Sequence, residues 1–251
     1  MDRRLIMKNT NIVQIYGKHA VLAALQNTAR KHVKLTTTND LYEKYYDQIS
    51  PYKLKVELKT EREINSLYPE AVHQGLILHT SSVFLYGIES INKITSKNHS
   101  CIFMLDQITD PQNIGAIVRS ALAFGVDAII IPEHNSPNET PSLAKASSGA
   151  IEQVPVVKVT NLINTINYLK KQNYWVAGLD SNSDKYIDKS SMSNKTVFIL
   201  GAEGKGLRKL TLENCDFVVK IMISDKIDSI NVSNAAAITM YEYYKEFGIA
   251  K

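Results

Sequence analysis

Residues 196–210, TVFILGAEGKGLRKL, combine the two features that decide the fold class. The run Thr-Val-Phe-Ile-Leu is continuously apolar, which is typical of a strand buried on both faces of a parallel sheet. Three glycines, Gly201, Gly204 and Gly206, follow within six residues. Because ligands of parallel sheets bind beyond the carboxyl ends of the strands, this loop is a candidate binding loop. Phosphate is a poor fit, since the carboxylate of Glu203 lies in the middle of the loop.

Three other continuous apolar runs are separated from this stretch by helical patterns. They are Cys-Ile-Phe-Met-Leu from residue 101, Ala-Ile-Ile-Ile from residue 128 and Trp-Val-Ala-Gly-Leu from residue 175. One helix is expected to begin near Asn113 as its N-cap and to stop at Gly125, and another to begin at Thr140 with Pro141 in its first turn. The pattern predicts an α/β fold with a mainly parallel sheet covered on both faces. Residues 106–113, 201–206 and 221–231 are the loops expected at its carboxyl edge.

The first 80 residues show a smaller α/β pattern. Helices are expected at 18–26, from about 40 and at 61–67, and strands at 32–37, 53–59 and 75–78. Residues 81–99 are more polar and less periodic, which is typical of a linker. The sequence therefore predicts a first domain at 1–80, a linker at 81–99 and a second domain at 100–251.

Composition and charge narrow the class of protein. The chain has 251 residues, of which 44% are hydrophobic and 22% charged, as in globular proteins. It shows neither a membrane-spanning run nor a signal peptide, so a cytoplasmic protein with no membrane partner is expected. Cys101 and Cys215 are expected to be free thiols, and no metal site is expected. Residues 1–80 carry 12 Lys and Arg against 8 Asp and Glu, whereas the rest carries 17 of each.

This basic excess makes the first third the better candidate for contact with a polyanion, although charge alone favours the simpler interpretation of a solubilising surface. The glycine order G-x-x-G-x-G fits neither the dinucleotide-binding G-x-G-x-x-G pattern nor a P-loop. A cationic or neutral ligand, such as an adenosine that bears a sulfonium, therefore fits the loop better than a phosphate.

Three segments resemble the signature motifs of the SpoU (TrmH-like) RNA ribose 2′-O-methyltransferases of the SPOUT superfamily. They are LDQITDPQNIGAIVRSALAFGVDAIII (105–131), ILGAEGKGLR (199–208) and DSINVSNAAAITMYE (228–242), in the family's order. IYGKHAVLAAL (15–25) and AVHQGLIL (71–78) are similar to the substrate domain of bacterial enzymes that methylate a guanosine ribose in large-subunit (23S) rRNA. The resemblance covers virtually the whole chain.

The resemblance implies a homodimer whose catalytic domain forms a deep trefoil knot and whose N-terminal domain is L30e-like. It also implies methylation of a guanosine 2′-hydroxyl of 23S rRNA from S-adenosylmethionine, with no DNA partner. Small residues in the second and third motifs permit the close backbone crossings of a knot. The implied cofactor contacts are Gly201, Ile221 and Ile230, with Leu200, Ala202, Gly204 and Met222 beside them.

The implied catalytic residues are Arg119, Asn113, Glu203, Asn231 and Ser233. A ribose hydroxyl is a weak nucleophile, so its oxygen needs help as the proton leaves. Guanidinium is effectively always protonated, which makes Arg119 better suited to stabilising charge on the oxygen, or to holding the adjacent phosphate, than to acting as a base. Taken singly, each of the other residues has a structural interpretation: Asn113, Asn231 and Ser233 as helix caps, and Glu203 as an exposed carboxylate.

Two more sets of residues are candidates for contact with RNA or a second copy, and two positions differ from the family's usual residues. His73 and Gln74 match a region that the family is thought to use toward RNA, but a surface pair that closes a strand is equally consistent. The aromatic run Tyr241, Tyr243, Tyr244 and Phe247 is interpreted as a dimer interface, in preference to core or a base-stacking set. Met222 and Asp225 replace the family's usual proline and glycine; we expect an intact cofactor site, with Asp225 in the left-handed region that glycine would favour.

Two other functions fit parts of the pattern. A related enzyme that methylates transfer RNA would carry the same three motifs, but the basic N-terminal domain favours ribosomal RNA. A non-catalytic ribosome-assembly factor would keep the fold alone. The joint presence of Asn113, Arg119, Glu203 and Asn231 favours an enzyme.

Overall fold

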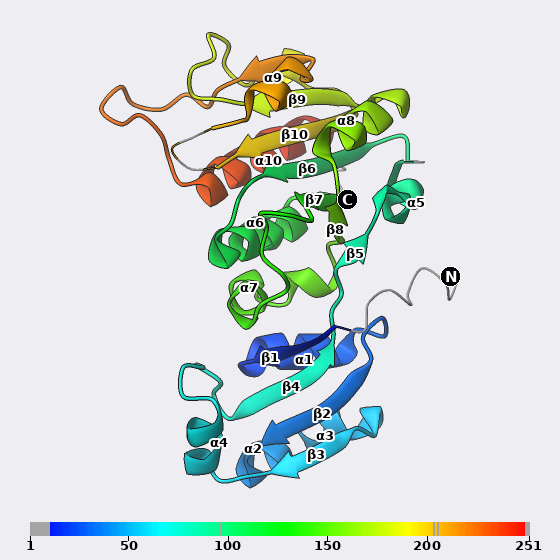
Figure 1. Cartoon of the computed structure of the whole chain (residues 1–251), viewed down its shortest axis with the longest axis vertical. Coiled ribbons are helices and arrows are strands. Elements are labelled where there is room, and N and C mark those ends of the chain that lie inside the picture. Colours follow the sequence, from blue (N-terminus) through cyan, green and yellow to red (C-terminus); the bar gives the residue numbers. More distant parts are fainter. Residues whose placement is uncertain (1–10, 96, 203, 205, 249–251) are drawn as a thin grey trace.

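The computed structural model describes residues 11–95, 97–202, 204 and 206–248, which form two α/β units stacked along the long axis of the molecule (Figure 1). Glu203, one of the predicted catalytic residues, lies outside the described residues. Among the described residues, no helix has the length and apolarity that crossing a bilayer would require. Cys101 and Cys215 are free thiols. Burial raises the pKa of Cys101 well above its usual range and that of Cys215 to about 11.

The small unit, residues 11–81, is a four-stranded sheet with helices around it (Figure 1). Its elements are β1 (Ile12–Tyr16), α1 (Lys18–Gln26), β2 (His32–Thr37), α2 (Asn39–Lys44), α3 (Tyr46–Ile49), η2 (Ser50–Tyr52), β3 (Lys55–Leu58), α4 (Glu61–Leu67) and β4 (Leu76–Ser81). The strand order is β1-β4-β2-β3, with β2 and β3 parallel and the other pairs antiparallel. Every helix and strand predicted for this region is present, with shifted ends at β3 and β4.

The large unit, residues 85–248, carries a seven-stranded sheet of order β11-β9-β10-β6-β7-β8-β5. Its elements are β5 (Leu85–Tyr86), η3 (Ile88–Ile91), α5 (Asn92–Thr95), β6 (Ser100–Asp106), α6 (Pro111–Ala123), β7 (Ala128–Pro132), α7 (Pro141–Ser147), η4 (Ala150–Glu152), β8 (Val156–Val159), α8 (Leu162–Lys171), β9 (Trp175–Leu179), η5 (Lys189–Ser191), β10 (Lys195–Gly201), α9 (Lys209–Glu213), β11 (Phe217–Val219) and α10 (Val232–Phe247). All its strand pairs are parallel.

Helices cover both faces of the large sheet, as the continuous apolar strands predict. On one face, Ile117 of α6, Leu143 of α7 and Met240 of α10 join a single buried cluster. On the other face, Ile166 of α8 and Ile91 of η3 belong to a second cluster. The side chains of β6 and β10 alternate between the two clusters, so this central pair of strands is buried on both sides.

Helix α6 begins earlier than the sequence predicts. The cap is Asp110, whose carboxylate accepts a hydrogen bond from the Gln112 backbone N–H at 2.8 Å, and Pro111 occupies the first turn. The prediction of Asn113 as the cap is therefore wrong, and Asn113 lies inside the first turn. At the other end, Gly125 has the expected left-handed conformation with φ of 65°.

The segment 81–99 is not a free linker. Leu85 and Tyr86 form β5, which pairs with β8 at the edge of the large sheet. Ile91 is fully buried in the cluster under α8. Two residues are too few to show the period of a strand, which is why the sequence pattern missed β5. The exact boundaries of the two-domain division stay a prediction.

Helix α7 lies at the junction between the two units (Figure 1). Ala144 of this helix belongs to the apolar core of the small unit, beside α1 and β1. A side chain at Gly149, which follows α7, would come within 2.9 Å of Ala23 on α1. The small unit therefore packs directly against a helix that is also part of the large unit's core.

Candidate functional site

The loop that follows β10 folds back on itself at very short range. A Cβ atom built on Gly201 would lie 2.1 Å from the carbonyl of Gly206, closer than any real contact. The Gly206 N–H donates to the carbonyl of Ala202 at 2.9 Å, which closes the loop. Gly204 and Gly206 have φ of 74° and 65°, in the left-handed region. Glycine is thus required at 201 for space and favoured at 204 and 206 for conformation.

A cavity of about 470 Å³ opens beyond the carboxyl ends of β9, β10 and β11. Six of the seven predicted cofactor residues line it: Gly201, Ile221, Ile230, Leu200, Ala202 and Gly204. Met222 does not belong to the wall, because its side chain points outward and is 72% exposed. Its neighbour Ile223 lines the cavity instead. The prediction that Met222 contacts the cofactor therefore finds no support in this geometry.

The backbone at Asp225 differs from the expectation, which took this residue to replace the glycine that the family resemblance implies. Its φ is not among the positive values of the described residues. The expected left-handed conformation of Asp225 is therefore wrong, and aspartate occupies this loop without that strain.

Several residues of the cavity wall were not predicted from the sequence, among them Leu179, Asp180 and Lys220. Leu179 is the last residue of β9 and Asp180 follows it, and Lys220 follows the end of β11. Asp180 accepts hydrogen bonds from the backbone and side-chain nitrogens of Asn182, at 2.8 and 3.0 Å. The signal was available, since the rule that ligands bind beyond strand ends applies to β9 as well as to β10. Among the described residues of the cavity wall, Asp180 and Asp228 provide two carboxylates and Lys220 provides one ammonium group.

The loops after β6 and β10 are joined by a buried carboxylate. Asp106 ends β6 and lies beside Gly201 in the sheet register. Its side chain is fully buried, accepts a hydrogen bond from the Thr211 hydroxyl at 2.7 Å, and has the Arg208 Nε atom at 2.8 and 3.0 Å from its two oxygens. These contacts fix the start of α9 against the loop that leads to α6.

The first and third motifs meet at a pair of asparagines. The Asn231 side-chain nitrogen donates to the Asn113 Oδ1 atom at 3.0 Å, which joins the start of α10 to the first turn of α6. Asn231 also caps α10, because its Oδ1 atom accepts from the backbone N–H of Ser233 at 2.9 Å and from its hydroxyl at 2.6 Å. Three of the predicted catalytic residues, Asn113, Asn231 and Ser233, therefore lie together beside the cavity residue Ile230.

Arg119 is not brought to this group within the chain. It lies six residues after Asn113 on α6, about 9 Å along the helix axis and about 120° around it. Its side chain is exposed, and it forms no hydrogen bond or ion pair with any other described residue. Arg119 is therefore available to a ligand that approaches from outside the chain, and its catalytic role stays a prediction.

Comparison with known proteins covers both units. Residues 100–241 match the family described as SpoU rRNA Methylase, and residues 14–86 match the family described as RNA 2′-O ribose methyltransferase substrate binding. The chain belongs to the SpoU rRNA methylase family. Its SpoU segment contains the asparagine pair, Arg119 and every described residue of the cavity wall.

Relatives and solved structures agree with this SpoU assignment. The chain is 32% identical to the 23S rRNA (guanosine-2′-O-)-methyltransferase RlmB of Pseudomonas putida, over 94% of this chain and 98% of the relative. It is 33% identical to the RlmB of Coxiella burnetii, over 94% of this chain and 97% of the relative. The fold is similar to that of the SpoU methyltransferase AviRb from Streptomyces viridochromogenes in complex with AdoMet (TM-score 0.80, 18% identity, covering 98% and 94% of the two chains).

In the segment that matches SpoU substrate-binding domains, His73 and Gln74 lie in the turn before β4. His73 is buried, its Nδ1 atom accepts the Gly75 N–H at 2.9 Å, and its Nε2 atom lies 2.9 Å from the Asn65 Oδ1 atom. An exposed surface pair is therefore wrong for His73, whose ring holds the turn from inside, and an RNA contact of this turn stays a prediction. Gln74 is exposed, has φ of 51° and accepts the Lys18 N–H at 3.1 Å.

The aromatic residues of the last SpoU helix divide into two faces. Tyr243 is buried, and Phe247 packs on it with ring centroids 4.9 Å apart. Tyr241 and Tyr244 are 49% and 42% exposed, and both rings contact Phe124 at the end of α6, at 5.9 and 6.2 Å. A single interface formed by all four residues is therefore wrong; only the pair Tyr241 and Tyr244 is available to a partner.

Proposed function

We propose that this chain transfers a methyl group from S-adenosylmethionine to the 2′-oxygen of a guanosine in 23S rRNA. The observation that carries the proposal is the cavity formed by the folded-back loop after β10, with the pair Asn113 and Asn231 beside it. Membership of the SpoU rRNA methylase family and the names of the RlmB relatives support the reaction and the substrate. The cytoplasm, where ribosomal RNA is modified, is the proposed location.

The residues present fit the proposed cofactor. A cavity of about 470 Å³ lies in the range that nucleoside-sized ligands occupy. S-adenosylmethionine bears a sulfonium and an ammonium group, and the carboxylates of Asp180 and Asp228 in the cavity wall complement positive charge. The glycines of the loop bring backbone N–H and C=O groups close enough to hold an adenosine without a side chain between. When bound, the cofactor supplies an electrophilic methyl carbon.

The chain's own residues then have to place and activate the ribose hydroxyl. Asn113 and Asn231 form a hydrogen-bonded pair next to the cavity residue Ile230, and Ser233 holds the orientation of Asn231 through two hydrogen bonds. The guanidinium of Arg119 stays protonated, so it stabilises negative charge as it develops on the 2′-oxygen, or holds the adjacent phosphate. Glu203 completes the proposed set of polar groups.

A trefoil knot is the proposed path of the chain in the large unit, and an L30e-like fold that of the small unit. Support for the knot comes from the closeness of Gly201 to Gly206 and from the asparagine pair, which ties the start of the last helix to the loop after β6. The mixed four-stranded sheet with helices α1 to α4 supports the second assignment.

The active form is proposed to be a homodimer that joins through α6 and α10. Leu122, Ile238, Tyr241 and Tyr244 are each between 39% and 49% exposed, and they lie on two helices that contact each other. Large apolar side chains gathered on one surface mark interaction sites. Arg119 lies one turn before Leu122 on the same face of α6, so a second copy seated there would bring its own site toward Arg119.

Replacing both Tyr241 and Tyr244 by glutamate tests the dimer, because it places like charges in the proposed interface. Sedimentation should then show a monomer. Trp175→Glu is a matched control, since Trp175 is 51% exposed but lies on β9, and that variant should remain dimeric. A dimer that survives the double change would contradict the proposed interface.

The reaction is tested with purified protein, 23S rRNA and S-adenosylmethionine that carries a deuterated methyl group. After nuclease digestion, mass spectrometry should find the label in 2′-O-methylguanosine. Label on transfer RNA alone would favour the related transfer RNA enzyme, and label on a base would contradict ribose chemistry. Binding of rRNA without any transfer would favour a non-catalytic assembly factor.

A further inference from the structure

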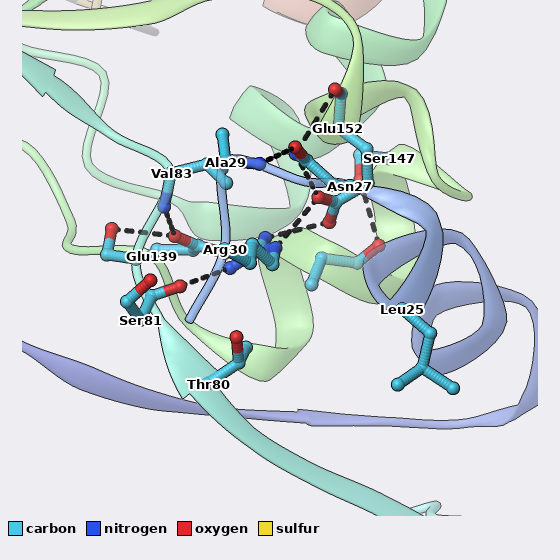
Figure 2. Close-up of polar contacts among 12 residues, drawn as sticks. Leu25, Asn27, Ala29, Arg30, Thr80, Ser81, Val83, Glu139, Ser147 and Glu152 are labelled. Atoms are coloured by element: carbon cyan, nitrogen blue, oxygen red, sulfur yellow. Dashed lines mark hydrogen bonds and ion pairs between the residues drawn. The ribbon is translucent and has the colours of Figure 1, made fainter. Parts of the chain in front are cut away.

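A buried charge cluster joins the small unit to the large unit (Figure 2). Arg30 lies in the turn between α1 and β2, and its side chain is 0% exposed. Its Nε and Nη2 atoms donate to the two carboxylate oxygens of Glu152, each at 2.7 Å. The Nη2 atom also donates to Glu139 at 2.5 Å, and Nη1 donates to the carbonyl of Ser81 at 2.7 Å. One guanidinium therefore binds two carboxylates of the large unit and the last residue of β4 in the small unit at once.

The two carboxylates are fully engaged by the small unit and the connecting segment. Glu139 accepts the Ser82 hydroxyl at 2.7 Å and the Val83 N–H at 2.8 Å through its second oxygen. Glu152 accepts the Asn27 side-chain nitrogen at 2.8 Å. Burial by itself lowers the pKa of Arg30, but the hydrogen bond with Glu152 and the charge of Glu139 outweigh it and leave that pKa raised. The cluster thus has one well-satisfied arrangement, which fixes the angle between the units.

Both ends of α7 are attached to Arg30. Glu139 directly precedes the N-cap Thr140, and Glu152 belongs to η4 just after the helix. The opposite side of α7 packs tightly against α6: a Cβ atom built on Gly115 would lie 2.6 Å from the Ala146 Cβ atom and from the Leu143 carbonyl oxygen. Gly115 is two residues after Asn113 and four before Arg119. A rigid path therefore leads from Arg30 through α7 to the helix that carries the proposed catalytic residues.

We propose that Arg30 is a positioning residue for methyl transfer, which holds the RNA-binding small unit at a fixed angle to α6. The inference rests on the proposed function. An RNA bound to the small unit would then present its ribose to Asn113 and Arg119 without a search over domain orientations, and this lowers the cost of forming the productive complex. Buried charge clusters are seldom better for stability than apolar residues of similar size, so an orienting role explains the cluster better than stability alone.

Direct RNA contact cannot explain Arg30, because its side chain has no exposed surface. Substitutions that change charge in opposite directions distinguish an electrostatic effect on RNA binding from an orienting role of the cluster. Arg30→Met removes a positive charge, whereas Glu152→Gln removes a negative one and should strengthen binding of a polyanion if electrostatics alone mattered. Under the proposal both variants raise the KM for 23S rRNA. Arg30→Lys keeps the charge but has one ammonium, which lacks the planar fork that spans both carboxylates, and should be intermediate.

Steady-state kinetics and small-angle X-ray scattering of the full-length chain test the proposal. We expect the KM for 23S rRNA to rise at least about tenfold in Arg30→Met and Glu152→Gln, because the two RNA-contacting surfaces are no longer held in register. kcat at saturating RNA and the Kd for S-adenosylmethionine should stay within about threefold, since the bound RNA restores the angle. The radius of gyration should increase. Lys170→Met, which removes the pair with Asp216 inside the large unit, is the matched control and should change none of these values.

An unchanged KM in Glu152→Gln, or scattering curves that superimpose on that of the natural chain, would overturn the proposal. If Arg30→Met fails to fold, the same measurements on Glu152→Gln and Arg30→Lys still test the orienting role. If the natural chain transfers no methyl group, the proposed function fails, while scattering and RNA affinity still test the orienting role by themselves.

Discussion

The glycine loop allows a test in which two similar substitutions have different physical effects. Gly201→Ala places a Cβ atom 2.1 Å from the backbone carbonyl of Gly206 and 2.4 Å from the Leu207 nitrogen. These are backbone atoms, which cannot rotate away as the end of a side chain could. The loop must therefore open by more than about 1 Å to restore ordinary contact. The φ of Gly201 is not positive, and the penalty is therefore steric alone.

The expected magnitudes follow from these contacts. Overpacking of this kind costs about 3 kcal/mol when backbone must move, which corresponds to roughly a hundredfold loss of affinity for S-adenosylmethionine. Gly204→Ala is the matched control. A Cβ atom there has no neighbour within 4 Å, so only the left-handed φ of 74° is penalised, at about 1 kcal/mol or roughly fivefold in affinity.

Isothermal titration calorimetry with S-adenosylmethionine measures both variants, with circular dichroism as a check that each chain is folded. If close backbone approach at Gly201 shapes the cavity, Gly201→Ala should lose much more affinity for S-adenosylmethionine than Gly204→Ala. Equal losses, or a larger loss in Gly204→Ala, would refute the reasoning that close backbone approach at Gly201 shapes the cavity.

Three other substitutions are predicted from particular contacts. Arg119→Ala should abolish methyl transfer and leave the Kd for S-adenosylmethionine within about threefold, because Arg119 lies outside the cavity wall; calorimetry beside a turnover assay checks this. Gly115→Ala should lower the free energy of unfolding by about 1–2 kcal/mol, because the clash of its Cβ with α7 outweighs the gain in helix propensity; urea titration measures it. Burial holds the pKa of His32 below its usual value, so stability should fall as the pH drops below about 6.5, where the unfolded chain takes up the proton more readily. Urea titrations at several pH values should show a shallower loss in His32→Gln, and an equal loss would contradict that role.

Local patterns in the sequence predicted most of the fold. The continuous apolar runs identified β6, β7, β9 and β10, and Thr140 followed by Pro141 located the start of α7. The predicted start of α6 was wrong because two residues near it can act as an N-cap. Asp110, which is followed by Pro111, is a stronger start signal than Asn113, and it caps α6. Short strands such as β5 and β11 contain too few residues to show a period.

Contacts between residues far apart in the chain could not be predicted from local sequence patterns. The resemblance named Asn113 and Asn231 for the site, but the hydrogen bond between them joins residues far apart in the chain. The burial of His73 was not predicted, because a histidine two residues before a glycine gives no sign of whether its ring points inward; here the ring accepts the Gly75 N–H. Arg30 bonds carboxylates 109 and 122 residues away, and a single arginine in a turn carries no pattern that would predict such partners.

The central claim is that the chain methylates a guanosine ribose in 23S rRNA, and a map of 2′-O-methyl groups in that RNA tests it most directly. The map should be made from cells with the natural chain, from cells without it, and from cells that carry Arg119→Ala. We predict that one guanosine loses its 2′-O-methyl group when the chain is absent, regains it with the natural chain and does not regain it with Arg119→Ala. Identical maps with and without the chain would contradict the account.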